Sequence, residues 1–195
     1  PLDLANEYGS DSLRDYLMRN MVLGQDATFT LDSFIKRYNA DLANDYGNLI
    51  NRIFILINKY FDDLIPEKNN LDSLDLELIA NIKQLQNSCI DNYNILKIHD
   101  AIDNAITIFR KLNKYLEDKS PWKTIKKDKN LAGTTLYIAI ESLRIGTILL
   151  YPIIPNKAKQ VLDSINSNEN DNTSFGILEP NKKIKIVTNI FPRII

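Results

Sequence analysis

The 195-residue sequence predicts an all-α protein in which about five main helices share one hydrophobic core. Long segments carry apolar residues at the three- and four-residue spacing of an amphipathic α-helix. Polar or proline-containing breaks separate these segments, as helix ends require. Hydrophobic residues make up 44% of the chain, which is enough for a substantial core and argues against global disorder. We therefore expect a helical bundle with short helices before it and an extended tail after it.

The N-terminal segment is predicted to form two short helices. The first follows Asp3, a suitable N-cap residue, and stops at Gly9. The second follows Asp11, spans about residues 12–23 and stops at Gly24. Neither helix can bury an apolar side alone, so the segment should pack on the rest of the chain or on something upstream. The apolar side of the second helix would consist of Leu13, Tyr16, Leu17 and, at its margin, Met21.

A longer helix is predicted from Leu31 to Phe61, capped by Thr30 or Asp32. Gly47 within it costs about 1 kcal/mol relative to alanine, which suggests the close approach of another helix. Polar residues spaced four or three apart form a stripe away from the apolar one. Such a stripe is most often a solvated face, although amide and guanidinium groups on a rigid helix can also read hydrogen-bonding patterns. The stripe consists of Arg37, Asp41, Asn44, Asn48 and Arg52.

Four more helices are predicted in the remainder of the chain. Cap-forming residues at 69–73 precede the first of them, and the break SPW at 120–122 with a basic turn, KTIKKDK, separates the second from the third. Residues 166–174 are almost wholly polar and should form a flexible loop. The tail, about 177–195, should lie back over the bundle and include a short strand-like piece. The four helices span about residues 74–93, 98–116, 131–151 and 156–165.

The composition excludes several classes of protein. With 24 basic and 25 acidic residues, a general polyanion-coating role is excluded, so any nucleic-acid contact must come from a local patch. Cys89, the single cysteine, should be a buried small hydrophobe, and His99 has no nearby partner for a metal site. Without a signal peptide or an apolar run of about 18 residues, the chain should be soluble, cytoplasmic and free of membrane contacts. Because it begins at Pro1, it is either processed or a piece of a longer chain.

Catalysis by this chain alone is not expected. It has no glycine-rich phosphate loop, no Ser–His–Asp set and no metal-ligand spacing. The paired acids at 62–63 and 117–118 fall at helix ends, where solvation explains them. The sequence therefore predicts a binding module with neither catalytic residues nor a bound cofactor or metal.

The clearest signal for binding is a tryptophan among lysines. An exposed indole can stack on an unpaired base, which is worth about 1–3 kcal/mol, while lysines neutralise phosphates. The alternative is a tryptophan packed beneath a helix corner with lysines that merely solvate it, and the spacing favours neither interpretation. The cluster consists of Pro121, Trp122, Lys123, Lys126, Lys127 and Lys129.

Asn48 and Arg52 could complete such a site. Because they are four residues apart on a helix, they lie one turn above the other. Cytosine shows an amino donor and two acceptors on its pairing edge, whereas an amide donates and accepts and a guanidinium donates in a planar fork. The two residues could hold an unstacked cytosine while Trp122 stacks beside it, and this is the usual mode of sequence-specific RNA recognition.

Several stretches closely resemble the methionyl-tRNA synthetase family. They are the opening PLDLANEYGSDSLRDYLMRNMVLGQDATFT, then RYNADLANDYGNLINR, SPWK, SLRIGTILLYPIIP and the terminal FPRI. The match runs in order through nearly the whole chain. The combination of NADLAN-x-x-GNLINR with a downstream PW is specific, because other class I synthetases share the helical bundle but not these motifs.

The resemblance implies a domain organisation and residue roles. Residues 1–27 correspond to the stem-contact segment that follows the catalytic domain, and residues 28–195 to the α-helical anticodon-binding domain of a class I synthetase. In the family, the anticodon residues read CAU on methionine tRNA, chiefly its first base. The implied site consists of Asn48, Arg52, Pro121 and Trp122 for the anticodon, with Lys123, Lys126 and Lys127 as candidates for phosphate contacts.

The family's catalytic domain, with its HIGH-type and KMSKS motifs and a knuckle that often binds zinc, is absent from this sequence. The resemblance implies that the parent enzyme is a methionine–tRNA ligase that uses ATP and Mg²⁺, whereas this piece should neither activate methionine nor bind ATP. Its expected partners are the tRNA anticodon loop and the upstream catalytic domain. The extra C-terminal dimerisation domain of some members is also absent, which implies a monomer.

Two alternatives remain open. A helical protein-interaction module without RNA binding would account for the near-zero net charge, but not for the tryptophan–lysine cluster together with the polar stripe. The anticodon domain of a related synthetase, for leucine, isoleucine or valine, would share the bundle and prefer an anticodon other than CAU.

Overall fold

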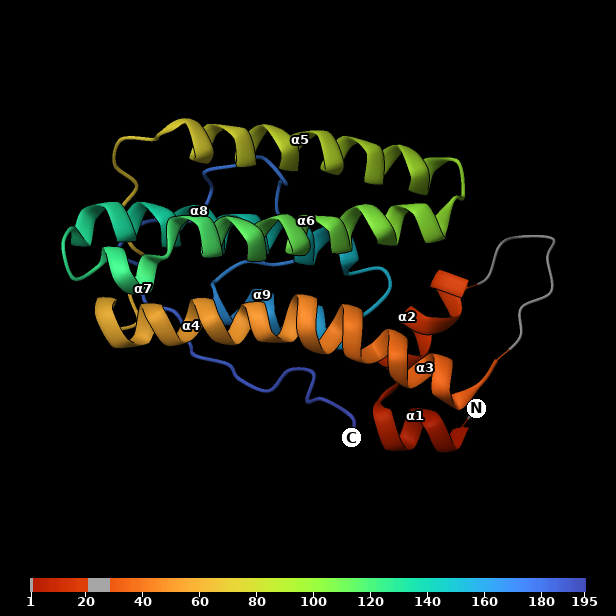
Figure 1. Ribbon diagram of the computed structural model, residues 1–195. Helices are drawn as coiled ribbons and strands as arrows, with labels where there is room; N and C mark the ends of the chain where they lie inside the picture. Colours follow the sequence, from red (N-terminus) through yellow and green to blue (C-terminus); the bar gives the residue numbers. More distant parts are fainter. Residues whose placement is uncertain (1, 21–28) are drawn as a thin grey trace.

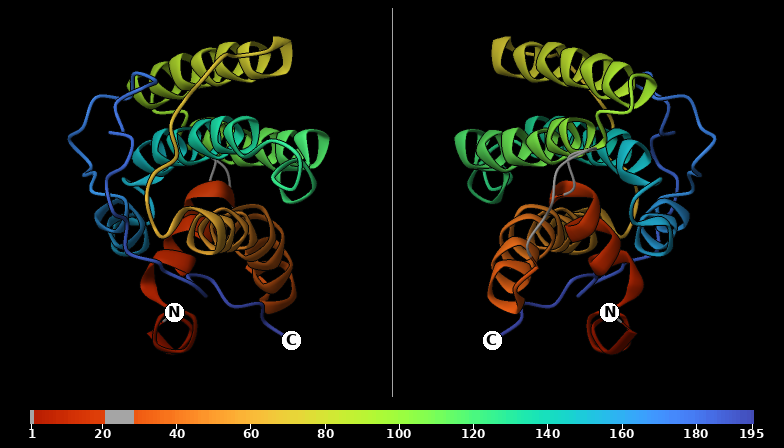
Figure 2. Two further views of the ribbon diagram at one scale, coloured as in Figure 1. Left: turned by 90° about the vertical axis from the view of Figure 1, so that its left-hand side faces the viewer. Right: turned by 90° about the vertical axis from the view of Figure 1, so that its right-hand side faces the viewer.

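The computed structural model describes residues 2–20 and 29–195, and these residues confirm the predicted all-α bundle with its extended tail. The elements are α1 (Leu2–Tyr8), α2 (Ser10–Asn20), α3 (Leu31–Arg37), η1 (Tyr38–Gly47), α4 (Asn48–Phe61), α5 (Ser73–Asn94), α6 (Ile98–Lys119), α7 (Pro121–Thr124), α8 (Lys129–Leu150) and α9 (Pro155–Ser164). The long helices form layers, with α5 outermost, α6 beside α8 in the middle, and α4 and α9 beneath (Figure 1). Figure 2 shows the same order along the helix axes.

Local sequence sets the helix starts. The Thr30 hydroxyl accepts a 3.1 Å hydrogen bond from a backbone N–H of the first turn, so Thr30 rather than Asp32 is the N-cap of α3. Asp72 caps α5 and forms a capping box with Asp75, and Asp128 caps α8. These N-caps define where the helices begin. The predicted first and last residues of the later helices differ from the observed ones by only a few positions.

The central helix α8 is buried from Ala132 to Leu150. A helix that is apolar on all sides belongs in the interior of a bundle. Among the described residues, α8 is the one helix long and apolar enough to cross a membrane, yet all of its apolar stretch lies inside the bundle. The expectation that the chain has no apolar run of about 18 residues was therefore wrong, because Glu141 and Arg144 are the only charged residues from 132 to 150.

Gly146 allows α8 to approach α6 closely. A Cβ atom there would lie 2.5 Å from Cε1 and 3.0 Å from Cζ of Phe109. Phe109 is fully buried, and its ring stacks on Tyr46 with 4.5 Å between centroids, so it has no room to move aside. We expect Gly146→Ala to lower the free energy of unfolding by up to about 2 kcal/mol, because overpacking costs about 1–3 kcal/mol and the helix propensity of alanine offsets about 1 kcal/mol.

Urea denaturation measures this change, and Gly133→Ala on the same helix is the matched control. A Cβ at Gly133 would lie no closer than 3.3 Å to the half-exposed ring of Phe61. The control should therefore lose less stability than Gly146→Ala, because it gains helix propensity and requires the Phe61 ring to shift by only a few tenths of an ångström. Equal losses in the two variants would contradict the close-packing explanation for Gly146.

The helical run from Leu31 to Phe61 is continuous, but it is not one α-helix. Its middle part, η1, is a π-helix. A π-helix forms i→i+5 hydrogen bonds, so residues four apart no longer stay on one line along it. Asp41 is 1% exposed and faces Arg110 of α6, whereas Asn44 and Asn48 are exposed. The prediction that the five residues form one polar stripe away from the core was therefore wrong at Asp41.

Gly47, at the end of η1, faces the C-terminal tail and not another helix as predicted. A Cβ atom there would lie 3.1 Å from the carbonyl oxygen of Leu42 and 3.3 Å from that of Phe191. Phe191 is buried against the rings of Tyr38 and Tyr46. The tail passes along the helical run (Figure 1), so a side chain at this position would force the backbone of the tail to shift.

The end of the tail is held by a side-chain amide of η1. Asn39 donates a 2.8 Å hydrogen bond to the carbonyl oxygen of Ile194 and accepts a 2.9 Å hydrogen bond from the N–H of the same residue. The predicted strand-like piece reduces to an isolated bridge between Leu64 and Lys183. Backbone hydrogen bonds join residues 63–65 to residues 181–184, but the N–H of Lys185 already donates to the carbonyl oxygen of Ser164, so the pairing does not continue into a sheet.

The polar loop after α9 was expected to be flexible, but a buried ion pair holds it. Arg144 donates to the carbonyl oxygens of Asn172 at 2.8 Å and Ser174 at 2.7 Å. Its Nε and Nη2 atoms also donate to Glu141 at 2.9 and 3.1 Å. Both charged side chains are fully buried, so the loop satisfies a charge inside the bundle.

The caps predicted for the first two helices are not observed. Asp3 lies inside the first turn of α1, and Asp11 lies inside α2. The Asp11 carboxylate instead accepts hydrogen bonds from the Asn156 amide at 2.9 Å and from the backbone N–H of Lys157 at 2.7 Å. A carboxylate is favourable at the positive N-terminus of a helix, so Asp11 ties α2 to α9.

The buried side of α2 is polar, which the predicted apolar side did not anticipate. Asp15 and Tyr16 are buried, whereas Leu17 is 36% exposed. The reason is that α2 packs against charged side chains of η1 and α6 rather than against a purely apolar surface. The predicted end of this helix, with Met21 and Gly24, lies outside the described residues.

Candidate nucleic-acid interface

Trp122 lies at the corner between α6 and α8. Ser120 ends α6 in the left-handed conformation, with φ 44°, and so redirects the chain. Pro121 is the first residue of α7, where its missing N–H is tolerated, and it is buried. The Trp122 ring packs against the core and remains partly exposed. The packing interpretation of the tryptophan is therefore confirmed in part, and base stacking on the accessible part of the ring stays a prediction.

Arg52 of α4 contacts this indole. Its Cζ atom lies 5.8 Å from the centroid of the Trp122 ring, which is a cation–π contact. The two residues come from elements far apart in sequence, and α7 lies over α4 in Figure 1. The Nη1 atom of Arg52 is buried, lies 3.9 Å from Glu117 and has no hydrogen-bond partner among the described residues. A buried donor without a partner is rare. The Arg52 side chain as a whole is 36% exposed, so other parts of it are accessible to a ligand.

Asn48 lies one helical turn before Arg52 on α4 and is exposed. Its amide donates a long hydrogen bond of 3.5 Å to Asn44 in the preceding turn. A bond of that length is weak, so the amide can turn to a ligand at little cost. The structure therefore brings Arg52 and Trp122 together, with Asn48 on the adjoining turn.

The lysines around the corner are exposed. Lys123 lies on α7, and Lys126 and Lys127 lie in the turn that follows it. The predicted basic turn of helix is therefore only partly helical, since α7 ends at Thr124. Lys129 begins α8, and its Nζ atom lies 5.1 Å from the centroid of the Phe61 ring. Within residues 2–20 and 29–195, none of the first three lysines forms an ion pair, and their contact with phosphates stays a prediction.

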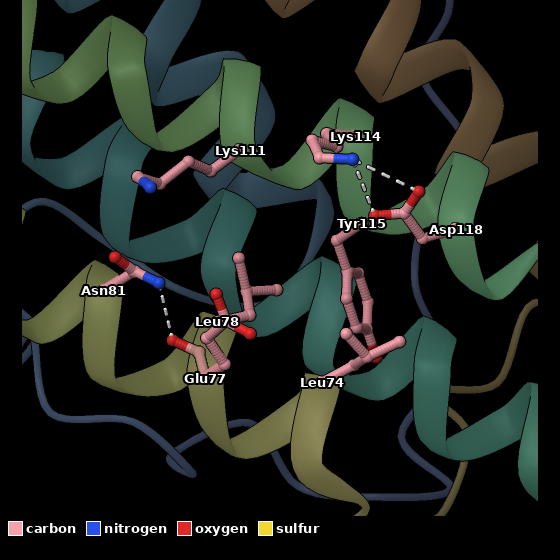
Figure 3. A pocket seen from close by; sticks show the side chains of 8 residues that line it. All are labelled: Leu74, Glu77, Leu78, Asn81, Lys111, Lys114, Tyr115 and Asp118. Carbon is pink, nitrogen blue, oxygen red and sulfur yellow. Dashed lines mark hydrogen bonds and ion pairs between the residues drawn. The ribbon is translucent and has the colours of Figure 1, made fainter.

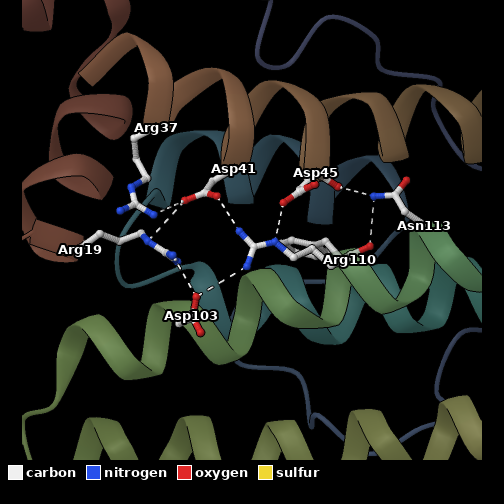
Figure 4. A network of polar contacts seen from close by, with 8 residues as sticks. Arg19, Arg37, Asp41, Asp45, Asp103, Arg110 and Asn113 are labelled. Carbon is white, nitrogen blue, oxygen red and sulfur yellow. Dashed lines mark hydrogen bonds and ion pairs between the residues drawn. The ribbon is translucent and has the colours of Figure 1, made fainter. Parts of the chain in front are cut away.

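A polar network around the buried Asp41 lies close to the start of α4 and joins α2, α3, η1 and α6 (Figure 4). Asp41 accepts a 2.8 Å hydrogen bond from Arg110 and lies 3.4 Å from nitrogen atoms of both Arg19 and Arg37. Arg19 also donates to Asp103 at 3.0 Å. Sequence reasoning missed Arg19 and Arg110, because no local pattern connects charges on three separate helices.

A shallow groove between α5 and α6 is a weaker candidate (Figure 3). It encloses about 120 Å³, and Leu78 and Tyr115 form part of its floor. Lys114 and Asp118 on its rim form an i,i+4 ion pair at 3.0 Å. This pair occupies the charged groups at that end of the groove, and the volume of the groove is too small for a nucleobase-sized ligand.

The contacts of Cys89 and His99 favour structural roles for both residues. As predicted, Cys89 is buried; its thiol donates to the carbonyl oxygen of Ala101 at 3.2 Å. Burial raises the pKa of this thiol to about 12, so it is not a nucleophile. His99 lies in the first turn of α6, with its Nε2 atom 3.1 Å from Asp100.

Two protein-family models match the chain. The anticodon-binding domain of methionyl-tRNA ligase matches residues 65–194, and the model for class I tRNA synthetases (M) matches residues 1–54. The second match crosses the predicted domain boundary at 27/28. That boundary lies among the residues that the structure does not describe, so it stays a prediction.

Known proteins resemble the chain over its whole length. The methionine–tRNA ligases of Caldanaerobacter subterraneus subsp. tengcongensis and Clostridium acetobutylicum are 32% and 34% identical to it over 200 and 199 residues. Each comparison covers 100% of this chain and 31% of the relative, so the chain spans about a third of the length of these proteins. The free Mycobacterium tuberculosis methionyl-tRNA synthetase superimposes with a TM-score of 0.91 at 29% identity, covering 100% of this chain and 40% of that one.

Proposed function

The chain belongs to the methionyl-tRNA synthetase family, and from this premise we propose that its bundle recognises the CAU anticodon loop of methionine tRNA. The recognising domain would be residues 28–195, and residues 1–27 would join it to a catalytic domain upstream. The observation that carries the proposal is the contact between Arg52 and the partly exposed indole of Trp122. Two elements distant in sequence meet there, and both residue types suit an unpaired base.

The recognition can be derived from the groups present. The Arg52 guanidinium, on a side chain that is 36% exposed, would donate to an acceptor on the pairing edge of cytosine, N3 or O2. The amide of Asn48, one turn away, would accept from the N4 amino group. Trp122 would stack on the base, with Pro121 holding the ring in place. Lys123, Lys126 and Lys127 would neutralise phosphates of the same loop.

For the complete protein we propose the activity named for its relatives, methionine–tRNA ligase. ATP and Mg²⁺ would be used by the catalytic domain, and no residue of the present chain would take part in the chemistry. We further propose that the protein is a cytoplasmic monomer. This division would leave the present chain with the task of selecting the tRNA.

Trp122→Ala and Arg52→Ala should each weaken binding of an RNA hairpin with a CAU loop by about 1–3 kcal/mol, the size expected for one stacked or bidentate base. Titration of the labelled hairpin, followed by fluorescence anisotropy, measures the change. Arg14→Ala, at an exposed arginine of α2, is the control and should bind as the parent does. If both site variants also bound as the parent does, the site assignment would be wrong.

The near-zero net charge favours a second candidate, a helical protein-interaction module. Salt separates the two, because phosphate contacts make the affinity fall steeply as salt rises. A parent protein that binds no hairpin at low salt would support the second candidate. A preference for a hairpin with a leucine, isoleucine or valine anticodon would instead indicate a related synthetase.

A further inference from the structure

The end of α6, just before the tryptophan corner, is held by a buried ammonium group. The Lys119 side chain is 6% exposed, and its Nζ atom lies 2.6 Å from Asp72 and 2.8 Å from Asp75. Burial alone would lower the pKa of Lys119, but its hydrogen bonds to the two carboxylates outweigh burial and raise it. The raised pKa of Lys119 keeps the ammonium charged near neutral pH.

These two carboxylates have fixed positions. Asp72 and Asp75 form the capping box that starts α5, so the backbone of that turn holds both of them. Asp75 is fully buried and also accepts a 2.8 Å hydrogen bond from the Tyr115 hydroxyl of α6. The side chain of Lys119 thus connects the end of α6 to the rigid start of α5.

The backbone of Lys119 connects the same residue to α7. The Thr124 hydroxyl, at the end of α7, donates to the carbonyl oxygens of Lys119 at 3.0 Å and Ser120 at 3.3 Å. Ser120 adopts the left-handed conformation, which is unfavourable for a residue other than glycine and must be imposed by its surroundings. The α7 helix is only four residues long and carries Trp122. The position of the indole therefore depends on the contacts that hold the two ends of α7.

We propose that Lys119 is a positioning residue for Trp122, which sets the indole against Arg52 through the ion pairs to Asp72 and Asp75. The expected change in RNA affinity rests on the proposed function. The expected change in the position of Trp122 does not. Lys119 is too deeply buried to meet RNA itself. Its contribution to binding is therefore indirect, through the geometry of the corner.

The experiment uses the 195-residue chain and its single tryptophan, whose fluorescence reports on this corner alone. In Lys119→Met, acrylamide should quench the emission of Trp122 more efficiently than in the parent. The affinity for a CAU hairpin should fall about tenfold, the effect of one misplaced stacking contact. Lys114→Met is the matched control, because Lys114 is an exposed lysine on the same helix, and both quantities should be unchanged there.

Asp72→Asn tests the proposal if Lys119→Met fails to fold. Asparagine is as good an N-cap as aspartate, and this side chain is half exposed, so the variant should fold while Lys119 loses one charged partner. Increased quenching in either folded variant, with circular dichroism as in the parent, supports the proposal. Parent-like quenching and affinity in Asp72→Asn, and in Lys119→Met where it folds, would overturn it.

The same measurements separate this proposal from the proposed function. If the parent binds no CAU hairpin, anticodon recognition fails, yet the quenching of Trp122 in the variants still decides whether Lys119 positions the indole. If the parent binds and the variants change affinity without any change in quenching, the RNA function stands and the positioning role of Lys119 is wrong.

Discussion

Replacing Arg144 by methionine is expected to lower the free energy of unfolding by about 3–5 kcal/mol. The substitution leaves the Glu141 carboxylate buried without its charged partner, and it also frees the carbonyl oxygens of Asn172 and Ser174. An unpaired charge inside a bundle is among the most destabilising changes that one substitution can make. Urea denaturation followed by circular dichroism measures the loss.

The matched control is Lys159→Met, which removes a cation from an ion pair with Asp163 on the surface of α9. Exposed pairs of this kind contribute about 0–1 kcal/mol, so the control should change stability little. A loss in Arg144→Met as small as that in the control would show that the buried pair does not hold the loop after α9.

The second large effect concerns pH. Asp15 on α2 is buried, and desolvation raises its pKa from 3.8 to about 7, with nearby Asp41 contributing and Arg19 and Arg37 opposing. One of its carboxylate oxygens has no hydrogen-bond partner among the described residues. The folded protein therefore holds a proton that the unfolded chain releases at lower pH.

The stability from this group is fully present below about pH 4 and is lost as the pH rises through about 7. One pKa unit corresponds to about 1.4 kcal/mol, so the full loss is about 4 kcal/mol. Asp15→Asn cannot release this proton. The variant should resemble the parent near pH 4 and be more stable by up to about 4 kcal/mol near pH 8.

Thermal or urea unfolding at several pH values tests this expectation. Asp91→Asn, at an exposed carboxylate of α5, is the control, and its stability should follow the pH dependence of the parent. A constant difference between Asp15→Asn and the parent from pH 4 to pH 8 would contradict the raised pKa of Asp15.

Much of the fold could be read from local patterns. The caps at Thr30 and Asp72 and the apolar spacing along α5, α6 and α8 depend on residues within one or two turns of each other, so sequence spacing determines them. The failures have a common cause. Asp11, Asp41 and Gly47 each face a segment distant in sequence, and nothing near them in the chain reveals it.

The candidate site was likewise predictable from the sequence only in part. Residue types and spacing were sufficient to single out Asn48, Arg52 and Trp122, because one helical turn places the first two together and an indole among lysines is conspicuous. The contact of Arg52 with Trp122 could not be predicted from spacing, since it depends on how α6 ends and how α7 turns back toward α4.

The amino-acid sequence therefore defines the helices, their apolar sides, and the residue types available for binding RNA, since each of these depends on periodicity along a single element. Packing between helices defines which charges are buried, where the tail fits against Gly47, and how Lys119 fixes the tryptophan corner. The physical reason is that burial and ion pairing are properties of two or more surfaces in contact, and a one-dimensional pattern contains only one of those surfaces.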